Sequence, residues 1–486
     1  MSDTLFGHPL VLLVVVGLPV FGIAVRLFGK SFAQIAKWYL YISVFAVIMV
    51  MDSIFFPFIG GKDWFFRFAV ELALISGILW WAFEAKDGEV GKALREMFKR
   101  PLVIAVSVFG LMVLLSSLFA YDFHAAFWSN YERGEGAFQM LHYFVFFALA
   151  VFFLKTEKDW KRIFGCSLVA ACLMIGYGIL GNFGVPTIIG SYASGTPPTG
   201  WLAKLTSGRF QGSLGNSAYV DAYLLFSMFF AAYLWIANRA SSKFGAARHW
   251  GYGILMAVFV FFFVIGQTRG AFLGLGAGIL VFLVSLVFSK NRMMRKVSLA
   301  VLGVLIVLGA AGFAVRNQSW VQNIPAGRLL QISTSDATAQ TRFWVWGAAW
   351  KGFLDRPVLG WGNENFTTVF DQYFNPNFYT PGVQTETWFD RAHSVFFDYL
   401  AEIGILGLLS YLAIFFVFYM EFIKSERRRS GKGGSEIAPV IERGLILAMP
   451  AAYLVQGVAI FDVLPMYLVL FLFLAFSTHY YSNQRI

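Results

Sequence analysis

The chain has 486 residues, of which 58% are hydrophobic and only 13% are charged, and its formal net charge is +11. Soluble domains carry about 25% charged residues, so this composition excludes an ordinary water-soluble globular protein. It predicts an integral membrane protein. In such a protein the positions of the basic residues report membrane topology, and the positive charge is no argument for binding nucleic acid.

Apolar runs long enough to cross a bilayer recur along the whole chain. A spanning helix needs about 20 apolar residues. Short basic or Gly/Pro-rich breaks separate thirteen such runs, at 8–28, 37–56, 64–83, 101–120, 137–154, 161–181, 217–237, 249–267, 270–289, 296–314, 394–420, 444–461 and 464–481. We therefore expect an all-α fold, a polytopic membrane helix bundle with about 12–13 transmembrane helices in a single domain over residues 1–486. The last two runs fit either two helices or one broken helix.

The first run and the cysteines carry little further information. No Lys or Arg precedes Arg26 and no small-residue cleavage site follows the run, so we interpret it as a retained span and not as a signal peptide. Cys166 and Cys172 lie in one predicted span, six residues apart. They face different sides of the helix and do not indicate a redox compartment.

The basic residues predict the topology. When successive loops are assigned alternately to two sides, one side receives 26 of the 38 Lys and Arg residues: Arg26, Lys30, Lys37, Arg485 and those of loops 86–100, 155–162, 239–248, 290–296 and 424–443. The positive-inside rule makes this side cytoplasmic, with the N-terminus outside and the C-terminus inside. The run ERRRSGKGG at 426–434 is then a topology determinant beside anionic lipid.

The other side carries one large loop, residues 315–392, and shorter loops at 121–136 and 182–216. The large loop is rich in tryptophan, with Trp320, Trp344, Trp346, Trp350, Trp361 and Trp388. Near 340–355 its apolar residues follow helical spacing, and Pro357 ends the pattern. This predicts an amphipathic helix on the outer membrane surface, where Trp346 and Trp350 would border a substrate cavity. A helix packed on the bundle without a ligand fits the pattern equally well.

Arg269 lies in the polar triplet of VIGQTRGAF, within a long apolar stretch. As one helix, residues 258–288 would measure about 46 Å, which is too long for a single crossing, so a turn is expected near 266–270 on the outward side. Arg269 then either snorkels to the headgroups or is held inside the bundle. Close helix packing would hold it inside through the glycines at 266, 270, 274 and 276. An arginine held there needs an anion, either a buried carboxylate or a phosphate.

Four further arginines are predicted on the outward side: Arg133 in NYERGEG, Arg209 in SGRFQGSLGN, Arg342 in the amphipathic helix and Arg391 in DRAHS. Guanidinium groups suit phosphate, and several together would neutralise a pyrophosphate. Asn216, close to Arg209 in sequence, is a further candidate for substrate binding. The outward side has no D-x-D motif and no His/Asp pattern with metal-ligand spacing, so neither a metal nor another cofactor is expected.

His393 lies where the large loop meets the membrane, in FDRAHSVFFDYLAEIGILGLL, with Asp390 and Arg391 before it and Glu402 after it. A neutral imidazole can accept a proton at ordinary pH, so His393 is a candidate general base. The alternative is a histidine that serves only packing.

Five segments, taken in order, resemble the O-antigen ligase and O-antigen polymerase superfamily. They are ERGEG at 132–136, RFQGSLGNSAY at 209–219, QTRGA at 267–271, TRFWVWGAAW and PVLGWGNENF within 341–366, and AHSVFFDYLAEIGILG at 392–407. Each segment alone is a weak signal, whereas the ordered set around one outward loop is fairly specific. The resemblance covers roughly residues 120–465, and the first three spans contribute nothing to it.

The resemblance implies a metal-independent glycosyltransferase of the GT-C type in the bacterial cytoplasmic membrane, with its active site facing the periplasm. Such an enzyme passes a glycan from an undecaprenyl-pyrophosphate carrier to an acceptor hydroxyl and inverts the anomeric configuration. Arg269 and Arg342 match the family's catalytic arginines, and His393 matches its loop-end histidine. Family members commonly have His-Asn at this position, whereas Ser394 follows the histidine here. This departure leaves the orientation of the base open.

Several functions remain open at this stage. The acceptor is lipid A-core in a ligase, a second glycan in a polymerase, or a protein hydroxyl in a protein O-oligosaccharyltransferase. A transporter or flippase for lipid-linked sugar would use intramembrane polar groups such as Glu71, Asp221 and Asp462, but the inverted repeat typical of transporters is not visible. A non-catalytic scaffold for envelope assembly would leave the arginines and His393 without a role.

Overall fold

The computed structural model describes residues 9–51, 54, 56–130, 133–185, 200–206, 208–238, 243–319, 321, 337–379, 387–429 and 437–483. Within these ranges every regular element is a helix. The predictions for Glu132, Trp320, Arg485, residues 186–199 and 207 of the loop 182–216, the middle of the large loop and the end of the basic run at 426–434 lie outside the described residues.

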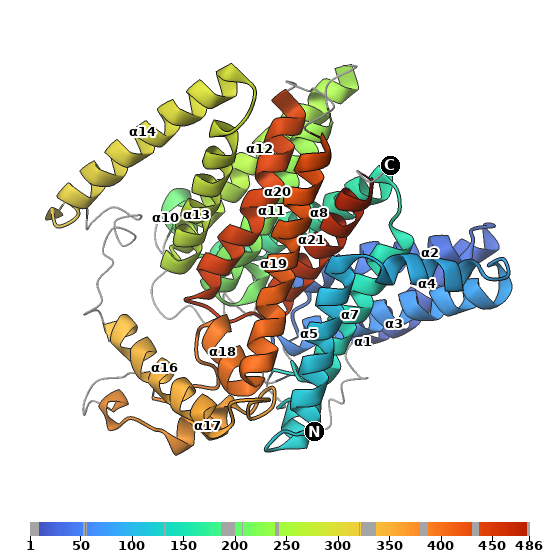
Figure 1. Ribbon diagram of the computed structural model, residues 1–486, viewed down its shortest axis with the longest axis horizontal. Coiled ribbons are helices and arrows are strands. Elements are labelled where there is room, and N and C mark those ends of the chain that lie inside the picture. Colours follow the sequence, from blue (N-terminus) through green and yellow to red (C-terminus); the bar gives the residue numbers. More distant parts are fainter. Residues whose placement is uncertain are drawn as a thin grey trace.

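The described residues form a bundle of apolar helices (Figure 1). Ten of these helices are long and apolar enough to cross a membrane: α3 (Gly60–Phe83), α5 (Pro101–Leu118), α8 (Glu157–Asn182), α11 (Ser217–Ala237), α12 (Lys243–Gly266), α13 (Arg269–Val287), α14 (Arg292–Val315), α19 (Gly404–Arg429), α20 (Ile437–Gly457) and α21 (Leu464–Asn483). Three shorter apolar segments are α1 (Pro9–Leu27), α2 (Phe32–Ser43) with its 3₁₀ extension η2 (Val44–Ile48), and α7 (Ala137–Phe153). Each predicted span has its counterpart here, and the last two are separate helices. The predicted polytopic helix bundle is therefore confirmed.

The connections contain the 19-residue helix α16 (Ala337–Asp355) and several short helices: α4 (Glu89–Phe98), α6 (Phe123–Trp128), α10 (Trp201–Thr206), η3 (Gly212–Leu214), α17 (Phe366–Gln372), η5 (Pro376–Phe378) and α18 (Val395–Glu402). The helices α16, α17 and α18 lie together beyond one end of the membrane helices, at the lower left of Figure 1. We call this end the loop end of the bundle. The residues predicted to form an amphipathic helix near 340–355 are all within α16.

One predicted span contains a break that the sequence did not indicate. The expected span at 394–420 is two helices, α18 and α19, because the chain breaks at Gly404, which has a left-handed φ of 66°. The segment 357–362 packs into this break: the amide of Trp361 donates to the Ala401 carbonyl (3.0 Å). A Cβ on residue 404 would collide with the Val358 carbonyl. The hydrophobic run continues through the break, so hydropathy alone could not reveal it.

Burial separates a central helix from a peripheral one. In the apolar stretch of α21, 89% of the residues are buried inside the protein, whereas in that of α14 only 6% are buried. The helix α14 lies at the edge of the bundle beside α13 (Figure 1). At the loop end a second, smaller apolar core joins α16, α17 and α18 through residues such as Val345, Phe366 and Ala401. This core fixes the large loop against the bundle and so positions the residues described next.

Candidate active site at the loop end of the bundle

The turn that carries Arg269 is fastened to a neighbouring helix. The helix α12 ends at Gly266 and α13 begins at Arg269, as the length argument predicted. Asp221 on α11 accepts a hydrogen bond from the Thr268 amide (2.9 Å), and a Cβ on Gly266 would collide with the same carboxylate. Gln267 has a left-handed φ of 53°, which is uncommon for a residue other than glycine. The turn is thus held in one conformation.

Glycines also bring α13 directly onto α20. A Cβ on Gly274 would lie 2.5 Å from the Ala452 carbonyl oxygen, and one on Gly270 would lie 3.1 Å from the Ala459 Cβ. The prediction of close packing holds at these two positions. It is wrong for Gly276, where a Cβ would meet nothing within 4 Å, because that residue is on another face of the helix. The position that continues the packed face is 278, four residues after 274.

Arg209, Arg269 and Arg342, which we call the arginine group, come from three separate segments. Arg209 donates from Nε to the Gly266 carbonyl (3.0 Å) and from Nη2 to the Thr268 hydroxyl (2.9 Å), so it sits on the turn that carries Arg269. Arg342 lies on α16. Burial lowers its pKa, and the positive charges of Arg269 and Arg209 lower it further. The three guanidinium groups therefore create one region of positive potential, and a bound anion would reduce the repulsion among them.

His393 has a defined tautomer. Its Nδ1 lies 3.2 Å from the Arg391 carbonyl oxygen, which can only accept a hydrogen bond. Nδ1 must therefore carry the hydrogen, and Nε2 presents its lone pair. The ring packs edge-to-face between Phe389 and Phe461, with centroid distances of 5.4 and 5.1 Å. The backbone of His393 has a φ of 56°, so the residue is held in the left-handed region.

The electrostatics of His393 connect it to the arginine group. Burial lowers the pKa of the imidazole to about 4; the positive charges of Arg342 and Arg133 also lower it, while the hydrogen bond to the Arg391 carbonyl and the charge of Asp390 raise it. The imidazole is consequently neutral at ordinary pH. His393 thus lies within electrostatic reach of Arg342, and Arg342 lies within electrostatic reach of Arg269 and Arg209.

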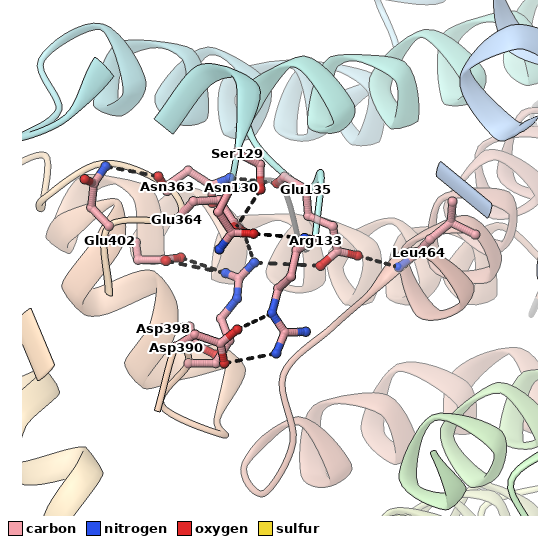
Figure 2. Close-up of polar contacts among 12 residues, drawn as sticks. Ser129, Asn130, Arg133, Glu135, Asn363, Glu364, Asp390, Asp398, Glu402 and Leu464 are labelled. Carbon is pink, nitrogen blue, oxygen red and sulfur yellow. Dashed lines mark hydrogen bonds and ion pairs between the residues drawn. The ribbon is translucent and has the colours of Figure 1, made fainter. Parts of the chain in front are cut away.

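Arg133 is committed to a carboxylate. Its Nη2 donates to Asp390 Oδ1 (3.0 Å), and its Nε donates to the other oxygen of the same carboxylate (Figure 2). The guanidinium also lies over the Phe461 ring, 5.0 Å from its centroid. Arg133 therefore lies beside the His393 site and is paired there with Asp390.

Arg391 lies outside the arginine group. Its side chain is buried among Glu135, Glu364 and Glu402, which we call the carboxylate cluster. One nitrogen, Nη1, donates to Glu402 Oε2 (3.1 Å), and Nη2 binds Glu364 and lies 3.7 Å from Glu135 Oε2. Figure 2 shows these three carboxylates converging from different segments. The protein itself therefore supplies anions for Arg391, and its role in substrate binding stays a prediction.

The remaining predicted binding residues have structural contacts. Asn216 caps α11 by accepting a hydrogen bond from the Ala218 amide (2.8 Å). Trp346 donates from its indole nitrogen to the Ala392 carbonyl (3.0 Å), so it supports the segment that carries His393. Trp350 is half exposed on α16 and remains available for a ligand.

Sequence reasoning did not assign a role to the carboxylate cluster. Glu135 and Glu364 each stand beside glycine or asparagine in the motifs GEG and NEN, within segments already quoted for the resemblance. Acidic residues in such motifs were a usable signal. The sequence could not show that Glu135 and Glu364 share Arg391 as a partner, because the two glutamates are 229 residues apart in the chain. In the described residues, no group of three or more His, Cys, Asp or Glu side chains is arranged to hold a metal ion.

These features define a multi-pass helical membrane protein with an arginine group and a neutral histidine at one end. Residues 253–412 match the family model described as O-antigen ligase. The matched segment runs from α12 into α19 and includes Arg269, Arg342 and His393. The match confirms the resemblance of this segment to the O-antigen ligase and polymerase superfamily. No curated protein matches the chain.

Proposed function

We propose that this protein is an O-antigen ligase-type glycosyltransferase that moves a glycan from undecaprenyl pyrophosphate to an acceptor hydroxyl, with lipid A-core as the acceptor. The proposal is carried by basic residues from segments far apart in the chain: Arg209 bonds to the turn that carries Arg269. The charges of both arginines lower the pKa of Arg342, and the charge of Arg342 lowers that of His393. A positive group beside a neutral imidazole suits a reaction in which a pyrophosphate leaves and a hydroxyl loses its proton.

The proposed chemistry is a single displacement. The acceptor oxygen forms a bond to the anomeric carbon while the bond from that carbon to the pyrophosphate oxygen breaks, and the bonding electrons leave with the pyrophosphate. Attack from the face opposite the leaving group inverts the anomeric configuration. Nε2 of His393 takes the acceptor proton and later releases it to water. The arginine group balances the charge that develops on the leaving pyrophosphate, so we propose that no metal is needed.

We further propose that the site faces the periplasm of a bacterium, across the cytoplasmic membrane, with the N-terminus outside and the C-terminus inside. Two observations support this orientation. The loop end carries Arg342 on α16, and most of the other basic residues fall in loops that the alternating assignment places on the opposite side. In that orientation the positive-inside rule is obeyed and the donor lipid meets the site from the outer leaflet.

The test is to reconstitute the purified protein with an undecaprenyl-pyrophosphate glycan and to supply lipid A-core, a second lipid-linked glycan and a protein acceptor in separate reactions. Transfer to lipid A-core with release of undecaprenyl pyrophosphate supports the ligase assignment. Transfer only to the second glycan or only to the protein replaces it with polymerase or protein O-oligosaccharyltransferase activity. Movement of intact donor across the bilayer, without released carrier, would show a transporter and refute the enzyme proposal.

A further inference from the structure

The backbone around His393 is fixed on both sides by groups that no proposed catalytic step uses. The Ala392 amide donates to Asp398 Oδ1 (2.6 Å), and the Val395 amide donates to the Ile460 carbonyl (3.1 Å). The Arg391 carbonyl accepts the hydrogen of His393 Nδ1. The direction of this last carbonyl decides where the imidazole ring points and which ring nitrogen is free.

The side chain of Arg391 is buried and paired with three carboxylates. Its three carboxylates come from three segments: Glu135 precedes α7, Glu364 precedes α17, and Glu402 ends α18. Two of them are themselves held, because Ser129 donates to Glu364 (3.0 Å) and Glu135 accepts from the Leu464 amide at the start of α21 (2.9 Å; Figure 2). A charged network buried to this degree is stable only when its members are paired.

We propose that Arg391 is a positioning residue for the transfer reaction: the carboxylate cluster locks its guanidinium, so its main-chain carbonyl holds the Nδ1 hydrogen of His393 and aims Nε2 at the acceptor hydroxyl. This inference rests on the proposed function for the role of His393, whereas the network and the tautomer it imposes do not depend on any activity. The same arrangement answers the question raised by Ser394, because a side chain at that position is not needed to orient the base.

Arg391→Lys tests the role. Lysine keeps the positive charge but cannot bind two of the carboxylates through separate nitrogens in the way a guanidinium fork does. We expect kcat to fall roughly 10- to 100-fold, the usual cost of losing a group that orients another, with donor affinity and KM unchanged. The matched control is Arg443→Lys, which disturbs an Arg–Glu pair (Arg443 to Glu426, 3.1 Å) far from the loop end; it should leave both parameters at wild-type values.

Glu402→Gln distinguishes positioning from donor binding. Removing a negative charge cannot weaken the binding of a phosphate, so a role of Arg391 in donor binding predicts equal or tighter donor affinity and normal turnover. A positioning role of Arg391 instead predicts that Glu402→Gln lowers kcat and leaves donor affinity unchanged. A raised KM with normal kcat in Arg391→Lys, or wild-type kcat in Glu402→Gln, would overturn the proposal.

A spectroscopic measurement keeps the proposal testable if a variant does not fold, or if the purified protein transfers no glycan. Nitrogen-15 NMR of histidine-labelled protein, with the His393 signals assigned by comparison with His393→Gln, reports which ring nitrogen carries the hydrogen. The wild-type protein should show the Nδ1–H tautomer of His393 only, and Arg391→Lys should show a mixture. A wild-type ring protonated on Nε2 would refute the positioning role, whereas the Nδ1–H tautomer in a protein without transferase activity would refute only the proposed function.

Discussion

The pH dependence of transfer tests the central electrostatic argument. In the free enzyme the pKa of His393 is lowered to about 4, first by burial and then by the charges of Arg342 and Arg133. An imidazole with that pKa is about 99% neutral at pH 6, whereas one with the ordinary value near 6.5 would be about one quarter neutral. Because only the neutral form accepts a proton, kcat/KM should be flat from pH 8 to about pH 5 and should fall only as the pH approaches 4.

Arg342→Gln is the informative perturbation. It removes a positive charge that lowers the pKa of His393, so that pKa should rise and the acidic limb of kcat/KM should move to higher pH. The level of kcat/KM should also fall, because Arg342 is proposed to bind the pyrophosphate. A bound donor should act in the same direction, since its negative charge offsets the arginine group, and the acidic limb of kcat should therefore lie at higher pH than that of kcat/KM in the wild type.

The assay is release of undecaprenyl pyrophosphate, measured from pH 4 to pH 8 with protein shown to be monodisperse at each pH. Lys351→Gln is the matched control, because it removes a positive charge from the same helix, α16, without being among the groups that shift His393. Its profile should equal that of the wild type. A wild-type midpoint near 6.5, or an acidic limb that Arg342→Gln leaves in place, would refute the proposed coupling between the arginine group and the base.

Three further outcomes follow from the geometry. His393→Ala should lower kcat by roughly 10² to 10⁴ with nearly intact donor binding, and His393→Gln should be almost as inactive; full activity in the glutamine variant would rule out the base assignment. Arg269→Ala should lose transfer while the protein still inserts and folds, and Arg269→Lys should rescue poorly because a point charge does not replace a bidentate fork; near-normal turnover in the alanine variant would argue against its contact with pyrophosphate. Gly274→Leu should destabilise the bundle by about 1–3 kcal/mol in thermal unfolding, since its Cβ would press on the Ala452 carbonyl, whereas Gly276→Leu should change little; equal effects would contradict the packing of α13 on α20.

The membrane helices could be predicted because the physics that selects them is local. A run of about 20 apolar residues has few alternatives in a bilayer, so length and composition suffice. The span predicted at 394–420 shows the limit of this reasoning. The break at Gly404 depends on the segment 357–362, which packs against it from about 45 residues earlier in the chain. Hydropathy carries no information about such a contact.

The arginines show the same limit at the site. On sequence alone, Arg342 and Arg391 are both candidates for contact with the substrate, and only the family resemblance gives Arg342 a catalytic role. Three-dimensional pairing separates them: Arg391 has three carboxylates of its own, and Arg342 faces two other arginines. Carboxylates of the protein balance the charge of Arg391, whereas a bound anion would reduce the repulsion between Arg342 and the other two arginines.

Residues with strained backbone conformations are concentrated in and around the candidate site. Among the described residues, four other than glycine have a left-handed φ: Ser129, Gln267, Glu364 and His393. Each costs of order 1 kcal/mol or more unless its surroundings fix it. Ser129 and Glu364 bond to each other in the network around Arg391, Gln267 forms the turn before Arg269, and His393 is the proposed base. The strain therefore lies in the segments that hold the two proposed catalytic functions, anion binding and proton removal. Because long membrane helices meet these segments, the bundle supplies the packing that keeps a strained site in one conformation.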